Sequence, residues 1–275
     1  MKDFTLDLWN VFLKLMPDYI GTAKEQMGDK ILRTKPDGTP VGDLDNLAMK
    51  ALRECIERHF PGDYTIGEED ERDEAEMQRI LARTDEFQWT IDGLDGTGNR
   101  RMGTTYGAMV SRRKGDVIPY AAFFRPVDQM LWKNGFIETE HGKGAWQWYG
   151  DGLDEQIQLL AAQHGALERH IVHLEGSSKK FFKFPGIINL GQNVTVRPSV
   201  SSCVAATAVA MGKASALVTV ENKPWDTWPA VALIKEAGGI VTDWKGKSVT
   251  PANCGSIVAA ANETDHAELV KLLNP

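Results

Sequence analysis

The segment of residues 89–97, Trp-Thr-Ile-Asp-Gly-Leu-Asp-Gly-Thr, constrains this chain more than any other. The apolar run over residues 87–91 predicts a buried strand that ends directly in Asp92 and Asp95. In a continuing strand the two side chains would point to opposite faces of the sheet. A tight turn at Gly93 instead brings both carboxylates to one centre, with the Leu94 carbonyl between them. Because clustered carboxylates repel one another, a buried pair is tolerated mainly beside a divalent cation.

Oxygen ligands without a neighbouring His or Cys favour Mg²⁺ or Mn²⁺ over zinc. The alternative is that the two aspartates only form a turn, because Asp-Gly is a common hairpin signal. Three more acids stand where α/β folds gather ligands, at strand ends and helix starts; they are Asp45, Glu68 and Asp226. Each also has a plain structural interpretation: helix capping for Asp45 and Asp226, and a solvated surface for Glu68.

Charge and composition exclude several classes of protein. The 275 residues include 31 Lys and Arg against 38 Asp and Glu, a net charge of −7, which disfavours a nucleic-acid polymer as partner. No apolar run approaches the roughly 20 residues of a membrane span. The N-terminal residues carry Asp3 and Asp7 within a helical pattern and lack a cleavage site, so they do not resemble a signal peptide. The three cysteines are widely spaced and odd in number, which fits a reducing compartment. We expect a cytoplasmic protein with no membrane partner.

The pattern along the chain predicts an α/β fold. Apolar residues at helical spacing predict helices over residues 4–19, 44–56, about 71–83, 203–211, 229–237 and 265–273. Strand patterns fall at residues 64–66, 87–91, 106–112, 117–125, 130–133, 216–220 and 257–261. Pro229 suits the first turn of its helix. We divide the chain into an N-terminal α+β domain, residues 1–145, which carries most of the acids, and a C-terminal α/β domain, residues 146–275, which carries Asp226.

Five segments, in the same order, resemble the inositol monophosphatase superfamily of Mg²⁺-dependent phosphatases. Residues 35–45 are similar to its K-x-D-G-[ST]-P-V…D pattern, and residues 67–69 to its G-E-E. Residues 91–97 are similar to its I-D-P-[IL]-D-G-T, residues 142–145 to its G-x-G-A, and residues 225–239 to its W-D…E-A-G-G. The resemblance runs from about residue 35 to residue 246. It implies a layered α-β-α-β-α sandwich, a homodimer, and hydrolysis of phosphate monoesters.

The resemblance also implies a set of metal ligands. Glu68, Asp92 and the Leu94 carbonyl would hold one Mg²⁺, for which Mn²⁺ substitutes. Asp92, Asp95 and Asp226 would hold a second ion, and a third, weaker ion would lie near Glu68. Paired cations neutralise a transferred phosphoryl group and lower the pKa of a water that attacks it.

Catalytic and phosphate-binding roles follow from the same resemblance. Thr97 and Asp45 would orient the attacking water and help to deprotonate it, and Glu68 would act with them. The backbone N–H groups of Gly96 and Thr97 would hold phosphate oxygens, and Asp95 would lie against the substrate. No covalent phospho-enzyme is implied, since the motif offers no nucleophilic Cys or His.

The chain departs from the family pattern near the expected substrate. Gly93 replaces the family's Pro, which predicts a looser ligand turn, and Trp228 would reshape the pocket wall. Arg100 would bind a second anionic group of the substrate or, alternatively, lie on the surface. Ser202 and Glu221 fall where family members contact substrate hydroxyls.

We therefore expect a phosphatase for a small polyol, sugar or amino-alcohol phosphate. The alternatives are a histidinol-phosphate, fructose-1,6-bisphosphate or 3′-phosphonucleotide phosphatase, or a catalytically silent member that binds a ligand.

Overall fold

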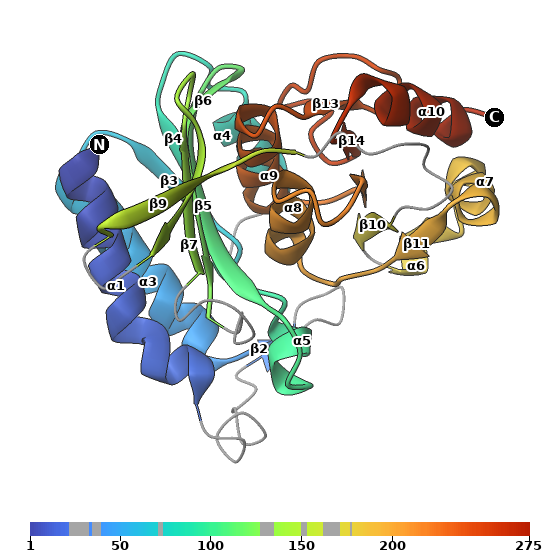
Figure 1. The fold of residues 1–275 in the computed structure, drawn as a ribbon. Coiled ribbons are helices and arrows are strands. Elements are labelled where there is room, and N and C mark those ends of the chain that lie inside the picture. Colours follow the sequence, from blue (N-terminus) through green and yellow to red (C-terminus); the bar gives the residue numbers. More distant parts are fainter. Residues whose placement is uncertain are drawn as a thin grey trace.

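Two β-sheets and the helices that cover them build the molecule (Figure 1). The computed structural model describes residues 1–21, 33–34, 40–70, 74–126, 135–149, 153–161, 171–176 and 178–275. The predicted strand over residues 130–133 and most of the motif at residues 35–41 lie outside these residues.

The larger sheet has seven strands in sequence order. They are β3 (Tyr64–Gly67), β4 (Gln88–Asp95), β5 (Gly107–Lys114), β6 (Val117–Arg125), β7 (Gly135–Glu140), β8 (Gly144–Tyr149) and β9 (Glu155–Leu159). β3 runs parallel to β4, and every later neighbour is antiparallel. A separate short pair joins β1 (Arg33–Thr34) to β2 (Pro40–Val41).

The smaller sheet has the order β11-β10-β12-β14-β13. Its strands are β10 (Ile171–Gly176), β11 (Thr195–Arg197), β12 (Ala216–Val220), β13 (Ile240–Asp243) and β14 (Ile257–Ala260). β10 runs parallel to both β11 and β12, so the carboxyl ends of β10 and β12 meet at one edge of the sheet. Such an edge is where open α/β sheets place ligands.

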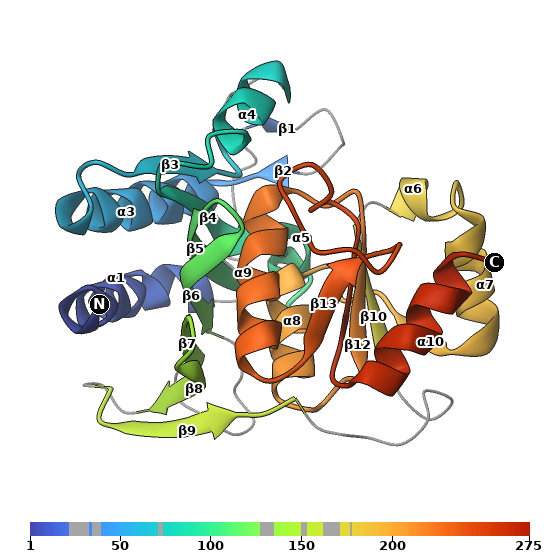
Figure 2. The same cartoon turned by 90° about the horizontal axis from the view of Figure 1, so that it is seen from above.

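Helices form three layers around the two sheets, which confirms the predicted α-β-α-β-α sandwich (Figure 2). One outer layer is α1 (Lys2–Ile20) and α3 (Asp43–His59), the middle layer is α8 (Ser202–Ala210) and α9 (Pro224–Glu236), and the other outer layer is α7 (Pro185–Asn193) and α10 (Glu263–Leu273). The shorter helices are α4 (Glu74–Leu81), α5 (Thr97–Arg101) and α6 (Ser178–Phe181).

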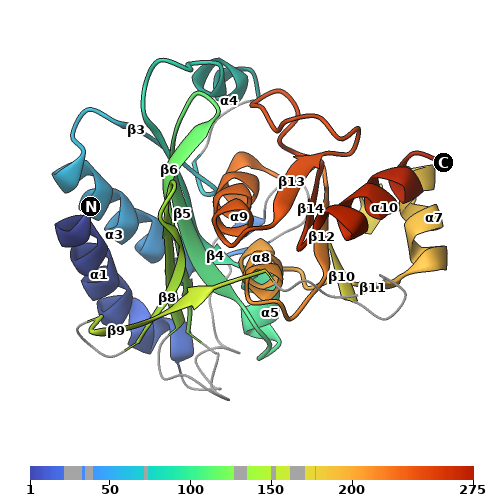
Figure 3. The same cartoon turned by 45° about the horizontal axis from the view of Figure 1, so that its top comes forward.

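Strand alternation explains the layers. In β5, Ala108 and Val110 face α1 and α3, whereas Met109 between them packs with α8 and α9. In β12, Leu217 faces the middle layer and Val218 faces α7 and α10. Because α8 and α9 lie between two sheets (Figure 3), they are apolar on nearly every side.

Most predicted elements are confirmed, with shifted ends. The helix expected over residues 229–237 begins at Pro224, so the first-turn proline is Pro224, and Pro229 lies inside the helix. The charged helix expected up to residue 83 ends at Leu81. Ser201 caps α8 by accepting a hydrogen bond from Val204 N, as its type and place predict.

The larger sheet continues past residue 145. The domain boundary expected between residues 145 and 146 falls inside β8, and β9 still pairs with β8, so the chain leaves this sheet only after Leu159. The division into two domains stays a prediction. Among the described residues, no helix combines the length and the apolar character that crossing a membrane requires.

Candidate metal centre and catalytic site

A β-bulge at the end of β4 brings the two motif aspartates together. Asp92 pairs with Met109 and Asp95 with Gly107, so three steps along β4 match two along β5. The extra residue offsets the alternation of the strand and turns both side chains toward the same side. The expected convergence is therefore present, although a bulge produces it where we expected a tight turn.

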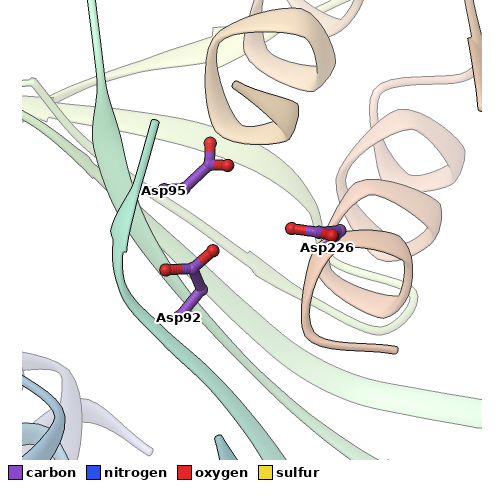
Figure 4. Close-up of side chains that lie close together, drawn as sticks. All are labelled: Asp92, Asp95 and Asp226. Carbon is purple, nitrogen blue, oxygen red and sulfur yellow. The ribbon is translucent and has the colours of Figure 1, made fainter. Parts of the chain in front are cut away.

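Asp226 completes the cluster from the opposite layer. It lies in the first turn of α9, and Figure 4 shows its carboxylate pointing across to Asp92 and Asp95. One oxygen from each of the three carboxylates lies within 4.8 Å of the others. Asp226 lies 131 positions after Asp95 in the chain, and the fold brings the two together.

The acids of this cluster raise one another's pKa. Burial raises the pKa of Asp92 well above its ordinary value, and the charges of Glu68, Asp95 and Asp226 raise it further. Burial likewise raises the pKa of Asp226, with Asp95 and Glu68 adding to the shift. Such a set of oxygen donors fits a hard divalent cation, which would relieve the repulsion.

Glu68 lies beside this cluster at the end of β3. Its side chain hydrogen-bonds to that of Asp92, and Glu68 N donates to Ile91 O at 3.1 Å. The parallel pairing of β3 with β4 accounts for this position, because it aligns Gly67 with Ile91 and places the next residue of each strand side by side.

Asp95 is also bound at the start of α8. Its carboxylate accepts from Ser201 Oγ at 2.5 Å, from Cys203 N at 2.7 Å and from Ser202 N at 3.2 Å. Burial raises the pKa of Asp95 to about 7, although the bonds from Ser201 and Cys203 oppose the shift. These contacts join the larger sheet to the middle helices at the site itself, and the sequence motifs did not indicate them.

Thr97 and Asp45 form the expected pair. Thr97 Oγ1 donates to Asp45 Oδ1 at 2.8 Å and lies 3.1 Å from Leu94 O, while Gly42 N donates to Asp45 Oδ2 at 2.8 Å. Burial raises the pKa of Asp45 to about 6, against the effect of these two bonds. Asp45 thus caps the start of α3 through Gly42 N and also accepts the hydrogen bond from Thr97.

The backbone at position 96 requires glycine. Its φ of 88° lies in the left-handed region, and a Cβ there would come within 3.2 Å of both Ser201 Cβ and Val200 O. The close approach of α8 and the turn into α5 therefore both depend on glycine at this position.

The expected substrate residues separate into two groups. Ser202 is buried beside Asp95 and its hydroxyl accepts from Asn222 Nδ2 at 3.1 Å, whereas Glu221 is half-exposed and pairs with Lys180 at 3.1 Å. A cleft of about 680 Å³ extends from Lys180 and Glu221 to Trp225 and α4. Glu221 has a φ of 49°, an uncommon conformation for a residue other than glycine.

Arg100 lies in the interior of the protein, which rules out one of the two expectations for it. It is 2% exposed, so it is no surface residue, and its Nε and Nη2 donate to the carbonyls of Tyr19 at 3.1 Å and Asp18 at 2.7 Å. The role of Arg100 in binding a second anionic group of the substrate stays a prediction. Its partners lie 81 and 82 positions away in the chain, and no local pattern pointed to them.

Two of the family-like motifs, residues 142–145 and residues 225–239, contact each other. Glu236, at the end of α9, accepts from Gly142 N at 2.9 Å and from Gly144 N at 3.0 Å. The G-x-G turn between β7 and β8 therefore anchors the far end of the helix that delivers Asp226. This part of the pattern is structural.

Comparisons with known proteins agree with this fold. The family model described as "Inositol monophosphatase family" matches residues 11–274. A histidinol-phosphatase of Chlorobaculum parvum is 26% identical over 240 residues, which cover 85% of this chain and 82% of the relative. Two solved structures share the fold. The Thermotoga maritima IMPase has a TM-score of 0.76 at 21% identity, covering 99% of this chain and 96% of its own. An IMPase/NADP phosphatase complexed with Mg²⁺ and phosphate has a TM-score of 0.74 at 17% identity, covering 96% and 92%.

Proposed function

This chain belongs to the inositol monophosphatase family and is therefore a phosphatase, and from that premise we propose that it hydrolyses a phosphate monoester of a small polyol, sugar or amino alcohol. One observation carries the proposal: three carboxylates from two layers of the fold meet within 4.8 Å, beside the hydrogen-bonded pair Thr97 and Asp45. A buried cluster of this charge has little structural value without a cation.

Members of the family are metal-dependent, and we propose that the ion here is Mg²⁺, with Mn²⁺ as a substitute and two to three ions in all. Glu68, Asp92 and the Leu94 carbonyl would hold one ion, Asp92, Asp95 and Asp226 a second, and Glu68 a weaker third. When bound, such cations neutralise phosphate oxygens and make a water more acidic. The related fold that was solved with Mg²⁺ and phosphate supports this choice.

The residues of the chain itself position the reactants. Thr97 donates a hydrogen bond to Asp45, which leaves the lone pairs of its hydroxyl oxygen available to accept a hydrogen bond from the attacking water. Asp45, with a pKa of about 6, is ionised near neutral pH and would accept the hydroxyl proton of Thr97 as Thr97 takes the proton of that water. Glu68 would act beside them. The backbone N–H groups of Gly96 and Thr97, at the start of α5, would donate to phosphate oxygens.

The leaving group would lie toward Ser202 and Glu221. The Lys180 ion pair already neutralises Glu221, so the wall of the cleft at this point carries little net charge. This arrangement suits a neutral polyol or sugar. The similarity to a histidinol-phosphatase, together with the sequence Pro224-Trp225-Asp226, favours an amino-alcohol phosphate as the second candidate. Fructose bisphosphate, a 3′-phosphonucleotide and a catalytically silent binding role are alternatives that the same assay separates.

We also propose that the protein is cytoplasmic, from its composition and cysteines, and that it is a homodimer, from its resemblance to the family. The test is phosphate release by the purified protein from a panel that includes inositol 1-phosphate, fructose 1,6-bisphosphate, histidinol phosphate and a 3′-phosphonucleotide, with and without Mg²⁺. We expect Mg²⁺-dependent release from at least one small monoester. No release from any of them, at several pH values, would contradict the proposal.

A further inference from the structure

A chain of hydrogen bonds connects α1 to the shared acid of the cluster. The Tyr19 hydroxyl donates to the carbonyl oxygen of Gly93. That carbonyl belongs to the Gly93–Leu94 peptide, whose N–H donates to Asp92 Oδ1 at 3.0 Å. One peptide plane is therefore held on both sides, by a phenol at its oxygen and by the Asp92 carboxylate at its nitrogen. A bond accepted by the carbonyl also polarises the N–H of the same peptide.

The end of α1 is itself fixed in place. Arg100 donates to the carbonyls of Asp18 and Tyr19, and Tyr106 Oη donates to Tyr19 O at 2.5 Å. All the side chains involved are buried, and Tyr19 is fully enclosed, with its ring edge against Phe124 at 5.3 Å between centroids. The phenol that reaches Gly93 thus comes from a rigid support.

Gly93 allows this contact. A Cβ at residue 93 would come within 2.8 Å of Met49 N and 3.0 Å of Ala48 Cβ, both in α3. The bulge therefore lies directly against the backbone of α3, and a larger residue would push it away.

We propose that Tyr19 is a positioning residue for the metal site and restrains the ligand turn. It acts through the Gly93–Leu94 peptide on two groups at once: Asp92, whose Oδ1 the peptide N–H holds, and the Leu94 carbonyl, which is the next peptide along. This inference rests on the proposed function, because it assigns the ligand turn to a divalent cation.

Two conservative variants test it. Tyr19→Phe removes the bond to Gly93 and keeps the ring in the core. Tyr120→Phe is the matched control, since it removes an equally buried phenol contact, to Thr5 Oγ1 at the other end of α1, away from the ligand turn. Each protein, stripped of metal with a chelator, is titrated with Mn²⁺, and free Mn²⁺ is measured by electron paramagnetic resonance. Thermal unfolding without metal gives the effect on stability.

We expect Tyr19→Phe to raise the Kd for Mn²⁺ about fivefold, the change that corresponds to loss of one neutral hydrogen bond. Excess Mn²⁺ should restore its turnover. Tyr120→Phe should lower the unfolding temperature to a similar degree and leave the Kd within about twofold of wild type. Equal Kd values for wild type and Tyr19→Phe, or equal increases in both variants, would overturn the inference while leaving the proposed function in place. Wild-type protein that binds no Mn²⁺ would contradict both.

Discussion

The Thr97 hydroxyl donates a hydrogen bond of 2.8 Å to the carboxylate of Asp45, which lies 52 positions earlier in the chain. Asp45 lies in the first turn of α3 in one outer layer, whereas Thr97 is the first residue of α5, directly after the bulge of β4. The bond brings a buried acid and a hydroxyl to the edge of the cluster formed by Asp92, Asp95 and Asp226.

Loss of the Thr97 hydroxyl should slow the reaction with little effect on metal binding. Thr97→Val keeps the side-chain volume but removes the contact to Asp45, and general-base assistance is worth roughly a hundredfold or more in rate. We expect kcat to fall by about that factor and the Kd for Mg²⁺ to change little. Thr97→Ser, which keeps the hydroxyl, is the control. A Thr97→Val enzyme with wild-type kcat would contradict the assigned role.

Asp92→Asn should abolish metal binding and turnover together. The change removes the charge that the two proposed ions share, so we expect turnover to fall by about three orders of magnitude or more. Because burial and three neighbouring acids raise the pKa of Asp92, the amide should also stabilise the metal-free protein. Calorimetric Mg²⁺ titration and thermal unfolding measure the two effects. Asp43→Asn, at an exposed acid of α3, is the control.

The stability of the metal-free protein should fall as the pH rises from about 4 to about 7. The pKa of Asp95 is raised to about 7 and that of Asp45 to about 6, from 3.8. In this window the folded protein binds more protons than the unfolded chain, so the free energy of unfolding decreases with pH.

Cation binding should reverse that loss. Excess Mg²⁺ binds the ionised carboxylates of the folded state and should raise the unfolding temperature more at about pH 8 than at about pH 5. Thermal unfolding with and without Mg²⁺ at several pH values measures the difference. An increase that does not depend on pH would contradict the assignment of Asp95 as a ligand.

Ser201→Ala should weaken both the fold and the site. The Ser201 hydroxyl caps α8 and donates to Asp95, so we expect the free energy of unfolding to fall by about 1–2 kcal/mol and the Kd for Mg²⁺ to rise. Asn262 caps α10 in the same way but lies away from the cluster. Asn262→Ala should therefore lower the free energy of unfolding and leave the Kd for Mg²⁺ unchanged. Denaturant unfolding and calorimetric Mg²⁺ titration separate the two effects. An unchanged Kd in Ser201→Ala would show that this bond does not support the site.

The sequence motifs predicted which acids meet, because each acid follows or precedes an element whose own pattern is clear. β3 and β4 are adjacent in the chain and parallel, which aligns Glu68 with Asp92. The bulge in β4 was not foreseen, since it is visible only in the pairing with β5. The attachment of Asp95 to α8 links residues 106 to 108 positions apart, beyond any local pattern.

Other differences have equally physical causes. Proline prefers the first turn of a helix, so Pro229 was expected to mark a helix start. In the structure α9 begins at Pro224, and because it is held between two sheets it tolerates Pro229 in its interior. Arg100 is charged and follows a loop motif, which suggested exposure, but the carbonyls at the end of α1 bind it in the interior. The apolar periodicity of β10 and α7 is weak in the sequence, and both elements are short. The sequence analysis therefore did not predict them.

The account depends on one arrangement: Asp92, Asp95 and Asp226 converge in order to hold divalent cations. Anomalous diffraction from crystals soaked with Mn²⁺ and phosphate tests it most directly. We predict Mn²⁺ peaks between these three carboxylates and Glu68, with phosphate beside Gly96 and Thr97. A map with no Mn²⁺ among the four acids, at a concentration that supports turnover, would contradict the central claim.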